Sequence, residues 1–187
     1  MKYPGQIRIV GGKLRGRKIP VLSMESLRPT PDRVRETLFN WLQGRLTSAR
    51  CLDFFAGTGI LGFEALSRGA KEVVMVDAAL TTVEVLKKTR ETLGLREEEC
   101  MIVWKDAREW IKTYQGPAFD LVFLDPPFQS TLLEECLTLL LESKLLSHAA
   151  KIYVEYPIEK QDPIIEGFEQ TKAKKAGMVA YCLYERI

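Results

Sequence analysis

The chain has 187 residues, of which 46% are hydrophobic and 28% are charged, so it is long enough for one large globular domain or for one domain with a small appendage. No apolar stretch is long enough to cross a bilayer, and the first residues lack the apolar core of a signal peptide, so we expect a cytoplasmic protein that makes no membrane contact. The four cysteines and the single histidine show no metal-ligand spacing, so we expect reduced core cysteines and no metal site.

The net charge is only +2, but the basic residues are concentrated at the start of the chain. Between residues 2 and 35, nine basic side chains stand against two acidic ones. Such an excess on a near-neutral body is typical of an arm that binds nucleic acid.

The first predicted element is a β-hairpin. Residues 6–10 and 14–21 read as two extended runs, and Gly11 and Gly12 between them predict a tight turn. The hairpin would present five cations as candidate ligands for a nucleic acid: Arg8, Lys13, Arg15, Arg17 and Lys18. A cationic ribbon can follow a phosphate backbone, whereas the alternative is a solvated hairpin whose charges only protect an edge strand from aggregation.

A helix is predicted next. Thr30 suits an N-cap, Pro31 the first turn and Asp32 the positive end of the helix. Apolar residues recur at helical spacing, so one face should pack on a sheet, and Arg33 and Arg35 are expected to project from the other faces. Three residues of this stretch join the candidate nucleic-acid ligands: Arg28, Arg33 and Arg35.

Residues 51–62 organise the rest of the chain. They begin as a buried strand, turn at Gly57 and Gly59 and resume as a helix, and in an open α/β sheet a ligand binds at such a point. With Gly62 the glycines match the dinucleotide pattern Gly-x-Gly-x-x-Gly, but Asp53 would repel a pyrophosphate and suits a ligand with an ammonium group. The alternative is a tight turn without a ligand.

Two further acids follow predicted strands. Residues 72–77 form a buried strand that ends in Asp77, where the dinucleotide fold binds ribose hydroxyls; the alternative is an acid that only caps the next turn. Residues 100–104 form the next strand, and Asp106 follows it. Asp106 can cap the following helix or accept a hydrogen bond from an exocyclic amine of a ligand, and both roles can hold together.

The most specific motif follows the strand at residues 119–124 and comprises Asp125, Pro126, Pro127 and Phe128. The two prolines fix the backbone and remove two donors, while the carbonyls before them remain acceptors. A carboxylate, free carbonyls and an aromatic face together suit a planar base that bears an amino group. The alternative is a rigid strand-to-helix connection.

The remaining elements are a helix over residues 131–144, a strand over residues 151–155 and an edge hairpin of two strands over residues 168–174 and 179–185. Strands alternate with helices up to residue 155, which predicts an α/β fold with a mostly parallel seven-stranded sheet and helices on both faces.

The glycine stretch, the acids and the Asp-Pro-Pro-Phe motif resemble the motif series of the S-adenosylmethionine-dependent class I methyltransferases, in the branch that methylates exocyclic amines of bases. Residues 6–12, 15–17 and 28–41 closely resemble the RsmD family, which methylates the N2 amine of a guanine in 16S ribosomal RNA. The resemblance implies a Rossmann-like fold, with a hairpin extension over residues 1–27 and a methyltransferase domain over residues 28–187. The implied substrate is small-subunit ribosomal RNA or a 30S assembly intermediate, and we expect a monomer.

The resemblance also implies residue roles. The residues that would bind S-adenosylmethionine are Asp53 near its ammonium group, Ala56, Gly57, Thr58 and Gly59 under its methionine and ribose portions, Asp77 at the ribose hydroxyls, and Asp106 and Ala107 at the adenine. At the reacting amine, Asp125 and the Pro126 carbonyl would accept the two hydrogens and Phe128 would stack on the base.

Three alternatives remain open. An adenine-N6 methyltransferase can carry Asp-Pro-Pro-Phe, but the chain has no room for a separate DNA-recognition domain. A non-catalytic RNA-binding assembly factor would have no use for that motif. An NAD-dependent oxidoreductase would rest on the glycines alone.

Overall fold

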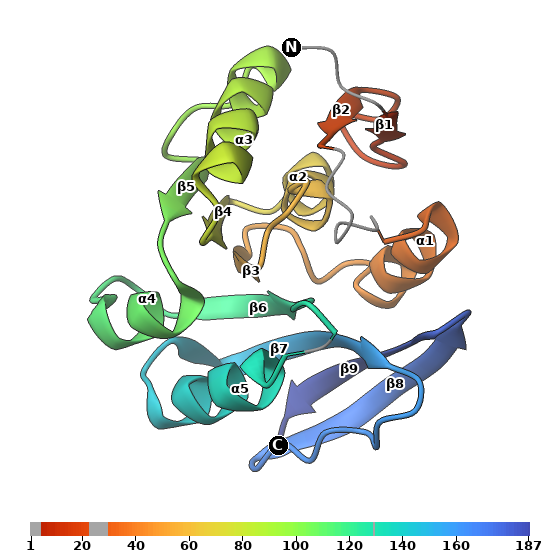
Figure 1. Ribbon diagram of the computed structural model, residues 1–187, viewed down its shortest axis with the longest axis vertical. Coiled ribbons are helices and arrows are strands. Elements are labelled where there is room, and N and C mark those ends of the chain that lie inside the picture. Colours follow the sequence, from red (N-terminus) through yellow and green to blue (C-terminus); the bar gives the residue numbers. More distant parts are fainter. Residues whose placement is uncertain (1–4, 23–29, 129) are drawn as a thin grey trace.

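The computed structural model describes residues 5–22, 30–128 and 130–187. Its centre is a seven-stranded sheet in the order β5-β4-β3-β6-β7-β9-β8 (Figure 1). The five strands from β5 to β7 in this order run parallel, and β9 and then β8 continue the sheet in antiparallel pairings. This arrangement confirms the predicted α/β fold.

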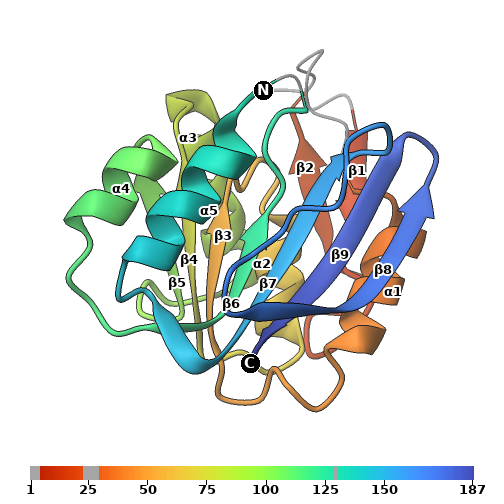
Figure 2. The same cartoon turned by 90° about the horizontal axis from the view of Figure 1, so that it is seen from below.

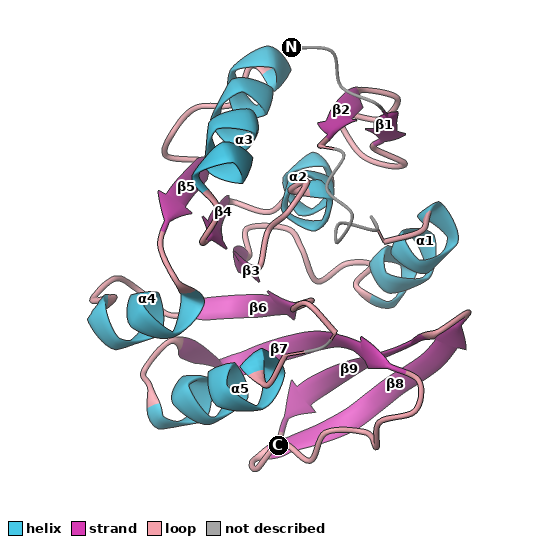
Figure 3. Ribbon diagram, in the orientation of Figure 1, coloured by secondary structure: helices cyan, strands magenta, loops and turns pink. Residues whose placement is uncertain are grey.

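The elements alternate as the sequence predicts up to the fifth strand of the sheet (Figure 3). In chain order they are β1 Gly5–Arg8, β2 Lys18–Val21, α1 Asp32–Trp41, β3 Arg50–Phe54, α2 Ile60–Ser67, β4 Glu72–Asp77, α3 Leu80–Leu93, β5 Cys100–Trp104, α4 Ala107–Thr113, β6 Phe119–Leu124, α5 Leu132–Glu142, β7 Leu146–Pro157, β8 Phe168–Ala176 and β9 Val179–Arg186. The fifth strand, β7, begins five residues before the predicted start at residue 151. Within the described residues, none of the helices has the length and apolar character that a membrane crossing requires.

Two hydrophobic cores lie on opposite faces of the sheet. Helices α1, α2 and α3 pack on one face, and α4 and α5 pack on the other (Figure 2). Consecutive residues of a strand therefore enter different cores, as Cys51 and Leu52 of β3 do. Burial on both faces explains why the parallel strands read as continuous apolar runs.

The β1–β2 hairpin forms, but its predicted Gly-Gly turn is wrong. The strands pair from Gly5 opposite Val21 to Arg8 opposite Lys18, and residues 9–17 make a long connection between them. Gly12 lies against α2 instead, with φ +75°, and a Cβ on it would come within 1.8 Å of the Ser67 carbonyl oxygen. The glycine pair therefore serves close approach between two segments, which sequence alone does not distinguish from turn chemistry.

Glu64 and Ser67 of α2 hold this connection. The backbone N–H groups of Val10 and Gly11 donate to the Glu64 carboxylate at 2.9 and 2.8 Å, and that of Leu14 donates to Ser67 Oγ at 2.9 Å. The arm also contributes apolar side chains to the core that α1 and α2 share: Ile9, Leu14 and Ile19. The basic arm is thus fixed to the α/β domain by polar contacts with α2 as well as by apolar packing.

Arg35 is buried, so the prediction that it contacts RNA is wrong. Its guanidinium donates to the Asp32 carboxylate at 2.5 Å and to the Arg8 carbonyl at 3.0 Å, and it lies 3.6 Å from the Glu64 carboxylate. The buried charge of Glu64 accounts for this inward orientation, because a buried carboxylate requires a nearby cation. Arg33 is exposed as predicted, whereas Arg28 lies outside the described residues.

Thr30 does not cap α1, contrary to the prediction. Pro31 occupies the N-cap position, and no side chain bonds to the first turn. The Thr30 hydroxyl points to two carboxyl groups at the carboxyl end of the sheet.

Candidate active site

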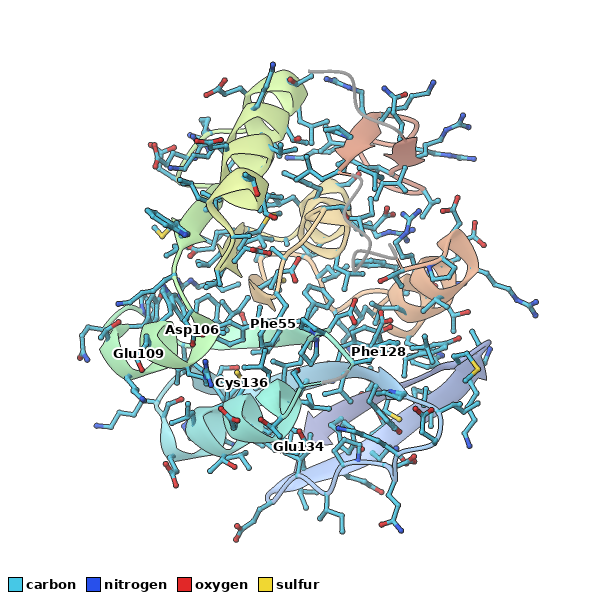
Figure 4. All side chains as sticks on the ribbon, viewed as in Figure 1. Phe55, Asp106, Glu109, Phe128, Glu134 and Cys136 are labelled. Carbon is cyan, nitrogen blue, oxygen red and sulfur yellow. The ribbon has the colours of Figure 1, made fainter. Side chains whose placement is uncertain are left out.

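A cavity of about 1120 Å³ opens at the carboxyl ends of β3, β4 and β6. Strand order reverses at β3, and the loops that follow its neighbours diverge there, which is where open α/β sheets bind ligands. Eleven of the twelve residues predicted for the cofactor and for catalysis line the cavity: Asp53, Ala56, Gly57, Thr58, Asp77, Asp106, Ala107, Asp125, Pro126, Pro127 and Phe128. Figure 4 shows three labelled residues of its wall, Phe55, Asp106 and Phe128.

Gly59 is the exception among the twelve, since it lies behind the wall at the N-cap of α2. Its φ is +73°, and a Cβ there would lie 2.5 Å from Leu86 and 2.7 Å from Phe63. The glycine is therefore required by helix packing and by backbone conformation. Gly59 is not among the residues that line the cavity, so its predicted contact with the cofactor stays a prediction.

Asp53 is only 2% exposed and is the penultimate residue of β3. Its Oδ2 accepts a hydrogen bond from the Gly62 backbone N–H at 3.0 Å, which ties the strand to the first turn of α2. Burial raises the pKa of this carboxyl well above its usual range, and the charges of Asp125 and Asp77 raise it further. Because no ion pair in the described part of the chain includes Asp53, a cationic ligand group would relieve the cost of its burial.

Asp77 connects the glycine loop to the next strand. Its two carboxylate oxygens accept hydrogen bonds from the backbone N–H groups of Gly57 and Ala79, each at 2.9 Å. The loop itself is strained, since Phe55 has φ +61° although it is not a glycine. Asp77 caps the following turn, as the alternative interpretation had it, and it also lines the cavity.

Asp106 is the N-cap of α4, which confirms the first of its two interpretations. It accepts from the Arg108 backbone N–H at 2.9 Å, and the Arg108 guanidinium holds both of its oxygens at 3.0 and 2.9 Å. Hydrogen bonds from Arg108 keep the pKa of Asp106 below its usual range, so it is a firmly ionised acceptor at the cavity. Ala107 begins α4, and its N–H has no acceptor within the helix.

Asp125 follows β6 and is partly buried. Burial raises the pKa of Asp125 to about 7, although a hydrogen bond from Thr30 opposes this shift. Pro126 is buried beside it, and the half-buried Phe128 adds an aromatic ring to the cavity wall. The loop thus places a carboxyl poised near neutral pH next to a flat apolar surface.

Two functional candidates were missed by the sequence reasoning, Thr30 and Glu155. The Thr30 hydroxyl lies 3.1 Å from Glu155 Oε1 and 3.5 Å from Asp125 Oδ2, and the Tyr153 hydroxyl donates to Glu155 Oε1 at 2.9 Å. Glu155 is 3% exposed. The available signal was an acid near the end of an apolar strand, the same feature that identified Asp53, Asp77 and Asp125.

The five cations of the hairpin arm are exposed, but two of them have partners on the protein. Arg17 donates to the Thr92 carbonyl at 2.5 Å, and Lys13 lies 3.8 Å from the Glu99 carboxylate. Arg8, Arg15 and Lys18 form no ion pair within the described residues. These three side chains are therefore the most available for an external anion.

The family described as conserved hypothetical protein 95 matches residues 7–185. The chain is similar to ribosomal RNA small subunit methyltransferase D of Haemophilus influenzae, with 47% identity over 97% of this chain and 94% of that protein. It is also similar to the solved structure of the putative methyltransferase YhhF from Escherichia coli, with 44% identity, coverage of 97% and 98% and a TM-score of 0.85.

A more distant solved structure is a putative methyltransferase complexed with SAH, with 16% identity, coverage of 99% of this chain and 57% of that chain, and a TM-score of 0.72. At that identity the likeness shows the fold alone. The match to residues 7–185 and the 47% identity over nearly the whole length confirm the resemblance noted in the sequence. The chain belongs to the family of ribosomal RNA small subunit methyltransferase D.

Proposed function

We propose that this protein transfers a methyl group from S-adenosylmethionine to the exocyclic N2 amine of a guanine in 16S ribosomal RNA. The observation that carries the proposal is the Asp125-to-Phe128 loop, which shares one cavity with acids from three other strand ends. Family membership supports the reaction class and the ribosomal substrate. We further propose that the enzyme works in the cytoplasm as a monomer, on the small-subunit RNA or on an assembly intermediate.

The residues of the cavity fit S-adenosylmethionine. The ammonium group, the ribose hydroxyls and the adenine amine of this molecule are all hydrogen-bond donors, and the cavity offers the acceptors Asp53, Asp77 and Asp106 at successive strand ends. In this proposal Asp53 would hold the ammonium group, Asp77 the ribose hydroxyls and Asp106 the adenine amine, with the Ala107 N–H donating to the adenine ring. Ala56, Gly57 and Thr58 would line the path between them.

The cofactor supplies an electrophilic methyl group when it is bound. The protein's own task is to position a weakly nucleophilic amine and to accept its proton. The Asp125 carboxylate and the Pro126 carbonyl would accept the two amine hydrogens, which localises the nitrogen lone pair. Phe128 would stack on the extruded base, and Pro127 would keep the loop rigid. The Asp125 carboxylate would then take the proton that the nitrogen loses, a role that its pKa of about 7 suits.

Transfer of labelled methyl groups tests the proposal. Small subunits that lack this methylation, free small-subunit RNA and duplex DNA would be offered with S-adenosylmethionine, and the modified nucleoside would be identified by mass spectrometry. We expect N2-methylguanosine from the ribosomal substrates. N6-methyladenosine would establish the adenine-N6 alternative instead, and tight RNA binding without any label would establish the assembly-factor alternative.

We expect RNA binding to depend on Arg15 and Lys18. Both are exposed cations of the arm without an ion pair in the described part of the chain, so each is free to neutralise a phosphate. Replacing both by alanine should lower the slope of log Kd against log salt concentration by about 1.5, because each lost phosphate contact removes about 0.7–0.9 from it. Filter binding to a small-subunit RNA fragment, at salt concentrations from about 50 to about 300 mM, measures this slope.

Lys71 and Lys144 provide the matched control for that experiment. Each is exposed and lies just before a strand, β4 or β7, at the end of the sheet opposite the cavity. The double replacement of these lysines removes the same charge and should leave the slope unchanged. Equal slopes for the two double variants would mean that the phosphates are held elsewhere.

A further inference from the structure

We propose that Thr30 and Glu155 form a positioning pair for Asp125, in which Glu155 is a neutral carboxyl that donates to the Thr30 hydroxyl and the Thr30 hydroxyl donates to the Asp125 carboxylate. The pair would keep Asp125 ionised and fix the direction of its acceptor oxygens. The inference rests on the proposed role of Asp125, on which Thr30 and Glu155 would act as positioning residues.

The geometry joins three segments that are distant in the sequence. Thr30 precedes α1, Asp125 follows β6 and Glu155 lies on β7. Thr30 Oγ1 lies between the two carboxyl groups, 3.1 Å from Glu155 Oε1 and 3.5 Å from Asp125 Oδ2. The longer distance is at the limit for a hydrogen bond, and such catalytic contacts tighten when the reacting complex forms.

The number of protons in this cluster decides which group donates and which accepts in each hydrogen bond. The Thr30 hydroxyl carries one proton and can donate it to one carboxyl group at a time. The Tyr153 hydroxyl already donates to Glu155 Oε1. If Glu155 carries a proton, its hydroxyl can donate to Thr30 Oγ1, and the Thr30 proton is then free for Asp125. A continuous chain of donors therefore ends at the Asp125 carboxylate only when Glu155 is neutral.

The charges around the cluster favour a neutral Glu155. The ionisable groups that face it are Asp53 on β3, Asp125 after β6, and Tyr153 and Tyr181 on β7 and β9. The neighbouring cation on α1, Arg35, donates to the Thr30 carbonyl at 3.3 Å and is engaged by Asp32 and Glu64. Within the described residues, no ion pair includes Asp125 or Glu155.

Buried carboxyl groups without a cation cannot all ionise. Burial, together with the charge of Asp125, raises the pKa of Glu155 well above its usual range. Glu155 is 3% exposed whereas Asp125 is only partly buried, so Asp125 is the carboxyl that ionises at the lower cost, and its charge then favours the neutral form of Glu155. A donor bond from Thr30 stabilises the ionised form of Asp125 and so extends its activity to lower pH.

The pH dependence of kcat/KM tests the pair, because its acid limb reports the pKa of the group that must be ionised in the free enzyme. Thr30→Val keeps the shape of the side chain and removes the donor. We expect its acid limb to move up by about one pH unit, so that kcat/KM at pH 6 falls about ten-fold relative to wild type and the two proteins converge towards pH 8.5. Thr30→Ser restores the hydroxyl and should restore the midpoint.

Glu155→Gln completes the experiment, because glutamine is a permanently neutral analogue of a protonated glutamate. Its acid limb should stay within a few tenths of a pH unit of the wild type. A limb that moves to lower pH would show that Glu155 is ionised and would overturn the proposal, as would a Thr30→Val profile that superimposes on the wild type. Thermal unfolding of each variant confirms that it is folded.

The identity of the wild-type product separates this inference from the proposed function. If the product is N6-methyladenosine, the guanine assignment fails, but the pH profiles still report on Asp125, since the same amine chemistry applies. If the product is N2-methylguanosine and the Thr30→Val limb does not move, the function stands and the positioning pair fails.

Discussion

Replacing Asp125 by asparagine is expected to remove methyl transfer and, at pH 8, to make the fold more stable. Activity should fall at least about 100-fold in kcat/KM, since the variant lacks the charged acceptor for the amine hydrogens and for the released proton. Asparagine keeps the shape of the side chain, so cofactor binding measured by calorimetry should change little. The assay is methyl transfer to the small-subunit substrate.

The gain in stability follows from the raised pKa of Asp125. The usual pKa of this carboxyl is 3.8, and in the folded protein burial raises it to about 7. Between these values the folded state binds more protons than the unfolded state, so the stability contributed by this group falls as the pH rises from about 4 to about 7. A shift of three pKa units corresponds to at most about 4 kcal/mol, and we expect about 2–3 kcal/mol because the side chain is only partly buried.

The same substitution at Asp162 is the matched control. Asp162 is exposed, and hydrogen bonds from Gln170 and Tyr156 keep its pKa below the usual range, so Asp162→Asn should not stabilise the protein at pH 8. Urea unfolding at pH 4 and pH 8 measures both variants. The advantage of Asp125→Asn should vanish at pH 4, where wild-type Asp125 is itself neutral. If Asp125→Asn is no more stable than wild type at pH 8, the ionised Asp125 carboxylate does not destabilise the folded protein.

The cavity could be predicted from sequence because its residues follow a local rule. Asp77 and Asp125 follow apolar runs directly and Asp53 lies one residue before the end of its strand, and parallel strands bring their carboxyl ends to one edge of the sheet. The same rule also covers Glu155, but β7 continues to Pro157, so the predicted end of the strand did not mark a loop residue.

Residues whose role depends on distant partners could not be predicted. A threonine before a helix usually caps it, and only the positions of Asp125 and Glu155, 95 and 125 residues away, show that Thr30 does not. Arg35 stands among polar positions of α1, and its burial depends on Glu64 of another helix. Apolar periodicity identifies the helix face that packs on the core, but it does not show which charged residue is buried because it pairs with a buried charge on another element.

Replacing Glu64 by alanine is expected to destabilise the protein by about 3–5 kcal/mol, which lowers Tm by roughly 10 °C for a chain of this size. The Glu64 side chain is fully buried and accepts from two backbone N–H groups of the arm, and Arg35 and Arg68 lie 3.6 and 2.8 Å from its oxygens. Its removal leaves the buried charge of Arg35 with less compensation. Thermal unfolding measures the loss, and Glu36→Ala, at an exposed site of α1, is the control that should stay close to wild type.

A second variant separates the ion pair from the arm contacts. Arg35→Met in the Glu64→Ala background removes the uncompensated charge, and two neutral side chains cost less than one unpaired buried ion. We therefore expect the double variant to be more stable than the sum of the single effects by about 1–3 kcal/mol. It should still lose hydrogen-exchange protection at Val10 and Gly11, because their N–H groups have lost their acceptor.

Strict additivity would show that the 3.6 Å contact between Arg35 and Glu64 contributes little and that the arm contacts carry the whole effect. Coupling would show instead that α1 and the arm depend on one carboxylate of α2. Thr30, two residues before α1, would then owe its place beside Asp125 to the same carboxylate, since the Arg35 guanidinium also holds the Thr30 carbonyl. In that case Glu64→Ala should also move the acid limb of the kcat/KM profile to higher pH, as expected for Thr30→Val.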